Sequence, residues 1–115
     1  MLAKKNRLTK KGSFAYLHAH GERVPEKKVK LNFVRSKNGV RIGFLVSNKI
    51  GHAVVRNKVK RRMRAIAREF TDKLYPCQAV FVVVPGVDKL SFDELKRQMT
   101  SCFNRAKLVK THEEA

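Results

Sequence analysis

The segment Val54–Phe70 has the strongest periodicity in the sequence, and it constrains the fold more than any other feature. At about 100° per residue, its apolar side chains fall within an arc of roughly 80°. They are Val55, Val59, Met63, Ile66 and Phe70. Lys and Arg fill almost all of the remaining surface. The pattern predicts an amphipathic helix with an apolar stripe for the core and a cationic face, on which the lone acid Glu69 pairs with Arg62 or Lys73.

Two strands and a short helix are predicted before this segment. Apolar residues alternate with polar ones in Val29–Arg35 and again in Val40–Ser47, as in half-buried strands. The pair Asn38-Gly39 between them is a strong hairpin signal, so we expect an antiparallel pair of adjacent strands. Upstream, a helix over Ser13–His20 is expected to begin at Ser13 as its cap and to end at Gly21.

The second half of the sequence predicts a buried strand and a further helix. Ala79–Val84 is a continuous apolar run, which indicates a strand buried on both faces. Ser91 and Glu94 form a capping box before a second amphipathic helix. The order α-β-β-α-β-α predicts an α+β fold, a small two-layer sandwich of helices over a mixed sheet. The 115 residues suit a single domain, 1–115, in which residues 1–11 form a flexible basic arm.

Charge is distributed very unevenly along the chain. The sequence has 27 Lys and Arg against 9 Asp and Glu, a net charge of +18. Residues 1–68 hold 20 of the basic and 2 of the acidic residues (+18), whereas residues 69–115 hold 7 of each (0). So many like charges repel one another in the folded protein. Binding to a polyanion explains this uneven charge better than a need for solubility does. No apolar run reaches the roughly 18 residues of a membrane span, and the N-terminus lacks the pattern of a signal peptide. We therefore expect a cytoplasmic protein with no membrane partner.

The sequence carries no recognisable catalytic motif. It has no Gly-rich phosphate loop, no HExxH and no cluster of carboxylates suited to a metal site. We therefore predict no catalytic and no metal-binding residue in this chain. Cys77 and Cys102 lie in apolar patterns and are too few for a disulfide framework or a zinc ribbon, which predicts two reduced core thiols.

The cationic helix is suited instead to binding nucleic acid. Arg56, Lys60 and Arg64 repeat every four residues, so they advance about 6 Å per step along one face, close to the spacing of phosphates in a strand. Phe14, Tyr16 and Phe33 lie among basic residues, as aromatic side chains that stack on unpaired bases do. A position in the core is equally consistent with the pattern around Phe33.

Three stretches of the sequence match the pattern of a known family. They are Phe14-x-x-Leu17-x-x-x-Gly21, Arg41–Gly51 (RIGFLVSNKIG) and Ala53–Arg64 (AVVRNKVKRRMR). Together they resemble the bacterial ribonuclease P protein subunit, and the similarity covers nearly the whole chain. The pattern Gly-x-Ala-Val-x-Arg-Asn-x-x-Lys-Arg, which begins at Gly51, is highly specific.

The resemblance implies a fold and a function. In that family the cationic helix joins two parallel strands by a left-handed crossover, the hand that about 98% of such connections avoid. The protein docks on a catalytic RNA, whose bound Mg²⁺ supplies the chemistry, and holds the single-stranded 5′ leader of precursor tRNA between the first helix and the sheet. The complex is an endoribonuclease that removes this leader. The implied partners are thus the catalytic RNA and precursor tRNA, with no cofactor in the protein and no protein partner required.

The resemblance also assigns residues to two RNA surfaces. Contact with the catalytic RNA is implied for Arg56, Asn57, Lys58, Lys60, Arg61 and Arg64, and is extended along the same face to Arg68. The leader cleft is expected to include Phe14, His18, Phe33, Ser47 and Lys49. His18 stands where the family often has a second aromatic residue, and Asn48 stands where it often has Lys.

Two other functions fit the composition. A small RNA-binding protein without an enzyme partner, such as a ribosomal protein, would carry a similar charge. A DNA-binding module could place Val54–Phe70 in the major groove, but so dense a set of cations leaves few polar side chains to read base edges.

Overall fold

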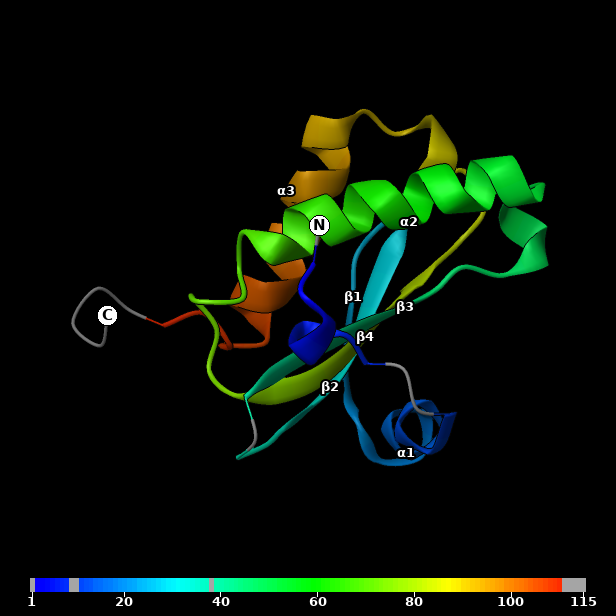
Figure 1. Cartoon of the computed structure of the whole chain (residues 1–115). Coiled ribbons are helices and arrows are strands. Elements are labelled where there is room, and N and C mark those ends of the chain that lie inside the picture. Colours follow the sequence, from blue (N-terminus) through cyan, green and yellow to red (C-terminus); the bar gives the residue numbers. More distant parts are fainter. Residues whose placement is uncertain (1, 9–10, 38, 111–115) are drawn as a thin grey trace.

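The computed structural model describes residues 2–8, 11–37 and 39–110, which form a four-stranded sheet covered by helices. The helices are α1 (Lys11–His20), α2 (Ala53–Arg68) and α3 (Phe92–Arg105), with short 3-10 helices η1 (Lys4–Asn6), η2 (Asn48–Ile50) and η3 (Val87–Lys89). The strands are β1 (Glu22–Pro25), β2 (Val29–Arg35), β3 (Val40–Leu45) and β4 (Cys77–Val83). Figure 1 shows α2 and α3 on one side of the sheet and α1 on the other. The predicted α+β class is confirmed.

The sheet has the strand order β1-β2-β4-β3, which contradicts the predicted hairpin. Strand β4 pairs antiparallel with β2 and parallel with β3, so β2 and β3 are not adjacent. The start of β4 enters between them: the Ser36 N–H donates to Pro76 O, and the Cys77 N–H donates to Gly39 O. Asn38 itself lies outside the described residues. Because β4 is apolar except for Gln78, a central position between two strands buries it better than an edge would.

The prediction of a strand buried on both faces is confirmed for β4. Ala79 and Phe81 point to the face that α2 and α3 cover, and Val80 points to the face of α1. The connection β3-α2-β4 joins neighbouring parallel strands, as the resemblance implied. Its left-handedness stays a prediction.

Local sequence signals predicted the helices but not strand β1. The Ser91 hydroxyl accepts from the Glu94 N–H, so the predicted capping box begins α3. Helix α1 begins at Lys11, before the predicted cap at Ser13. Strand β1 was not predicted, since its four residues have only one inward apolar side chain, Val24, and end at a proline.

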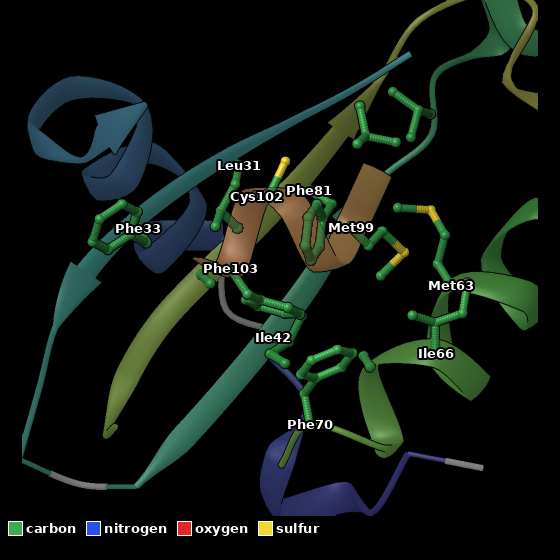
Figure 2. Close-up of a cluster of buried hydrophobic side chains, with 14 of the residues drawn as sticks. Leu31, Phe33, Ile42, Met63, Ile66, Phe70, Phe81, Met99, Cys102 and Phe103 are labelled. Atoms are coloured by element: carbon green, nitrogen blue, oxygen red, sulfur yellow. The ribbon is translucent and has the colours of Figure 1, made fainter. Parts of the chain in front are cut away.

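The main core lies between the sheet and the helices α2 and α3 (Figure 2). Phe81 of β4 meets Phe103 of α3 edge to face, with ring centroids 5.2 Å apart. Phe33 belongs to this cluster and is only 3% exposed. A ring enclosed in this way cannot stack on a base, so the assignment of Phe33 to the leader cleft is wrong. Strand alternation gives the physical reason, because Phe33 shares a face with the core residue Leu31.

A smaller core lies on the other face of the sheet, under α1. It consists of Leu8, Leu17 and Val80, with Phe14 and Val34 partly buried against them. This cluster packs α1 against the sheet and holds the Phe14 ring in place.

The N-terminal segment is part of the fold, which differs from the flexible arm expected over residues 1–11. Leu2 is buried in the main core, and Leu8 is buried in the smaller one. The Leu8 N–H donates to Ile42 O, and the Asn6 side chain donates to Val40 O. Residues 2–8 therefore cover the outer edge of β3, which would otherwise expose unpaired backbone groups. Residues 1, 9 and 10 lie outside the described part of the chain.

Substituting Gly43 is expected to destabilise the protein, because the Phe14 ring lies directly against this residue. A Cβ atom at position 43 would lie 2.8 Å from Phe14 Cζ and 3.0 Å from the Leu8 carbonyl oxygen. Such overpacking costs about 1–3 kcal/mol, which exceeds the roughly 0.5–1 kcal/mol that alanine gains over glycine in a strand. We expect Gly43→Ala to lower the free energy of unfolding by about 1 kcal/mol in urea titrations. Gly12→Ala is the control, since a Cβ there meets open space; equal stability of the two variants would contradict the prediction.

Candidate nucleic-acid interface

The cationic side chains of α2 divide into two groups by their exposure. Arg56, Lys60 and Arg64 are half-buried, and they follow one another at four-residue intervals beside the apolar stripe. The residues farther from the core are exposed, namely Asn57, Lys58, Arg61 and Arg68. All seven predicted contact residues of this helix therefore reach solvent at least in part. We call the exposed residues the outer face (Asn57, Lys58, Arg61, Arg68) and the half-buried residues the inner row (Arg56, Lys60, Arg64).

Neither the outer face nor the inner row has a carboxylate partner among the described residues. The ion pairs that the described residues form are Lys96 with Glu69 and Arg105 with Glu26. Glu69 thus pairs with α3, at a nitrogen–oxygen distance of 3.0 Å, and not with the predicted Arg62 or Lys73. Arg62 is used by the fold, because its guanidinium donates to Leu90 O. The cations of α2 that face solvent are therefore available to an external anion.

Two hollows flank Arg64. The outer one is open and is lined by Val54, Asn57, Arg61 and Arg64. Val54 is 80% exposed here, an apolar side chain surrounded by cations. The inner one is a cavity of about 100 Å³ at the edge of β3. Its lining combines α2 with the N-terminal segment, α1 and β3: Arg7, Leu8, Phe14, Ile42, Gly43, Phe44, Lys60 and Arg64.

The sheet beside α1 presents a second surface, which is partly open. The strand register places Lys30, Val82 and Leu45 in one row across β2, β4 and β3. Lys30 is exposed, Val82 is half-buried, and Leu45 is 45% exposed at the end of β3. An apolar strip with a cation at one end suits a base and its phosphate.

The adjacent row of the sheet contains a buried polar residue. The register places Asn32 beside Val80, and Val80 beside Gly43. Asn32 is 7% exposed, and its amide makes no side-chain hydrogen bond to another residue that the structure describes. The amide of Asn32 can donate and accept, and it borders the row of Lys30, Val82 and Leu45.

The five residues predicted for the leader cleft do not form one group. Phe14 lines the inner cavity, and His18 is exposed one helical turn further along α1. Ser47 and Lys49 are exposed after the end of β3, where Ser47 precedes η2 and Lys49 lies within it. Phe33 is in the main core on the opposite face.

Several residues of these surfaces were missed. Alternation along Val29–Arg35 places Lys30 and Asn32 opposite the core residues, which was sufficient to predict their face. No signal in the sequence singles out Arg7 from the other basic residues near the N-terminus. Its place in the cavity results from the burial of Leu2 and Leu8 on either side of it.

The two cysteines confirm the prediction of reduced core thiols, since both are free and buried. Burial raises the pKa of the Cys77 thiol to about 11, an effect that the Arg35 charge partly offsets. Burial raises the pKa of Cys102 to about 12, with a further increase from Glu26 and an opposing effect of Arg105.

Both thiols are expected to be unreactive in the folded protein and dispensable for function. Because pH 8 lies far below both pKa values, almost none of either thiol is present as thiolate, which is the reactive form. We expect labelling by a thiol reagent only on denaturation. Cys77→Ser and Cys102→Ser should lower the melting temperature and leave the activity of folded protein unchanged. Rapid labelling of native protein, or loss of activity with normal folding, would contradict this expectation.

The fold and its cationic helix together define a class, that of small basic α+β proteins whose surface suits a polyanion. Among the described residues, no helix is long and apolar enough to cross a bilayer.

Comparison with known proteins identifies the family. The family model for Ribonuclease P matches residues 2–107, and the chain belongs to this family. It is 32% identical to the ribonuclease P protein component of Bacillus velezensis over 111 residues, covering 95% of this chain and 96% of the relative. It is 29% identical to that of Clavibacter michiganensis, covering 92% and 96%. The structure of the Staphylococcus aureus RNase P protein superposes with a TM-score of 0.84 at 20% identity, covering 91% of this chain and 98% of that one. Membership implies a role in tRNA processing as part of a ribonucleoprotein, with an RNA as partner.

Proposed function

We propose that this protein docks on the catalytic RNA of ribonuclease P and holds the single-stranded 5′ leader of precursor tRNA. In this way it promotes endonucleolytic removal of the leader. The RNA subunit and its bound Mg²⁺ carry the catalysis, and the protein contributes binding and positioning. The observation that carries the proposal is the α2 surface, where seven polar or cationic residues reach solvent without a carboxylate partner among the described residues.

Docking is assigned to the outer face of α2. Arg61 and Arg68 are exposed on it and can each grip a phosphate with two parallel hydrogen bonds. This face should bind RNA regardless of base sequence, because cations that contact phosphates fix the position of an RNA and do not read its bases.

The leader is assigned to the surface between α1 and the sheet. Phe14 and His18 lie one turn apart on α1, and the open row of Lys30, Val82 and Leu45 crosses the sheet on the same side. Ser47 and Lys49 are exposed near the end of this row, beyond Leu45. Aromatic and apolar side chains next to cations are suited to a single strand, whose bases are free to stack.

Reconstitution with a bacterial catalytic RNA and precursor tRNA tests the proposal. We expect the protein to increase cleavage at low Mg²⁺, where an RNA with few counterions folds and binds substrate poorly without help. The stimulation should be larger for a precursor with a leader of several nucleotides than for one with a very short leader. A ribosomal-type RNA-binding protein would leave cleavage unchanged, and efficient competition by duplex DNA at physiological salt would favour a DNA-binding module instead.

A further inference from the structure

The inner cavity collects positive charge at one small site. Arg7 comes from the N-terminal segment, and Lys60 and Arg64 come from the inner row of α2. The other lining residues are apolar, and none of them is acidic. Two segments that are distant in the sequence therefore bring three cations to a space of about 100 Å³.

Holding these three cations together is electrostatically unfavourable in the absence of an anion. All three are half-buried, so water screens their mutual repulsion less than it does at an open surface. None of them forms an ion pair with a described residue. An anion in the cavity would offset this repulsion. A backbone phosphate is suitable because its two non-bridging oxygens share a negative charge and can each accept more than one hydrogen bond.

Arg7 is fixed in position by the fold. Its Nε donates to Leu2 O at 3.0 Å, which leaves its terminal nitrogens for other partners. The neighbouring backbone is held as well, since Leu8 is hydrogen-bonded to Ile42 of β3. A guanidinium held in this way loses less conformational entropy when it binds an anion than a mobile lysine does.

The aromatic ring of Phe14 lies in the same cavity as the cations. It lies on Gly43, and Phe44 forms another part of the wall. A phosphate next to an aromatic ring is the arrangement that a nucleotide of a single strand requires, because the base can stack while the cations hold the backbone. A paired strand would not supply a free base at this position.

We propose that Arg7, Lys60 and Arg64 bind one backbone phosphate of the precursor leader, with the adjoining base against Phe14. This inference rests on the proposed function and adds to it a particular site and a residue, Arg7, that lies outside the α2 motif. It also assigns the two groups of cations on α2 to two different RNAs. The outer face contacts the catalytic RNA, while Lys60 and Arg64 of the inner row hold the leader.

The test uses the reconstituted ribonucleoprotein and leaders that carry one neutral methylphosphonate linkage at a time. With wild-type protein, neutralising one particular linkage should weaken precursor binding about ten-fold, and other linkages should matter less. Arg7→Ala should weaken binding of the normal leader about ten-fold and abolish the additional effect of that linkage. Lys60→Gln should do the same, and it keeps the N-terminal segment intact because Lys60 makes no hydrogen bond or ion pair to a described residue.

Lys4→Ala is the matched control, because Lys4 is an exposed cation of the same segment that does not line the cavity. It should retain full sensitivity to the methylphosphonate linkage. Sensitivity that persists in Arg7→Ala and Lys60→Gln would overturn the phosphate site and leave leader binding in place. Weaker binding of the catalytic RNA alone, with no dependence on the leader, would assign the cations to docking and also overturn the site. A wild-type complex whose affinity ignores the leader would overturn the leader proposal as well.

Discussion

Replacing Arg61 and Arg68 together by alanine should weaken binding of the catalytic RNA on the order of thirty-fold at ~0.15 M salt. Each phosphate contact releases close to one counterion, which is worth about a factor of five at that salt concentration. The slope of log affinity against log salt should therefore shrink by about two units, one for each arginine. Both side chains are exposed on the outer face of α2 and make no hydrogen bond through their side chains to a described residue, so their removal should not affect folding.

The affinity is measured by filter binding of the protein to the catalytic RNA over a range of salt concentrations. The control is Arg97→Ala with Lys107→Ala, which removes the same charge from exposed positions in α3 and just after it. If binding depends only on net charge, the two double variants will lose affinity equally, and the outer face is then not the docking surface. The loss for Arg61 and Arg68 should be the same for every leader length, since it concerns the catalytic RNA alone.

Elements with a strong period of their own could be predicted from the sequence. The apolar stripe of α2 and the capping box of α3 specify helices through contacts a few residues apart, and both were located correctly. Strand pairing is different, because partners distant in the sequence compete for the same edges. The Asn38-Gly39 signal favoured pairing of β2 with β3, but β4, which is apolar except for Gln78, gains more by lying between them. Local turn chemistry did not decide this choice.

The candidate site shows the same distinction between local and long-range information. The motif on α2 was predictable because its residues share one helix. The cavity of Arg7, Phe14 and Lys60 was not, because it depends on how the N-terminal segment crosses the edge of β3. Phe33 shows a different error: its place among basic residues suggested a cleft residue, whereas alternation along its own strand already placed it in the core.

Phe14→Leu should weaken binding of precursor with a leader of several nucleotides by about 5- to 150-fold and leave binding of the catalytic RNA unchanged. Stacking on an aromatic side chain is worth about 1–3 kcal/mol per base, and leucine offers no such platform. Leucine keeps most of the apolar contact with Leu8, Leu17 and Val80, so the fold should be retained. Phe14→Ala would lose both the stacking and part of this packing, and comparison of the two variants separates their effects.

The measurement is precursor affinity of the assembled ribonucleoprotein as a function of leader length and salt. Phe14→Leu should have no effect when the leader is too short to reach α1, and it should barely change the salt slope because no charge is removed. Tyr16→Ala is the control. Tyr16 is 54% exposed and packs beside His20 with ring centroids 4.9 Å apart, on the flank of α1 opposite to Phe14 by helical spacing. A loss of leader-dependent affinity in Tyr16→Ala and not in Phe14→Leu would move the leader to the other side of α1. An equal loss at every leader length in Phe14→Leu would show that Phe14 serves the fold alone.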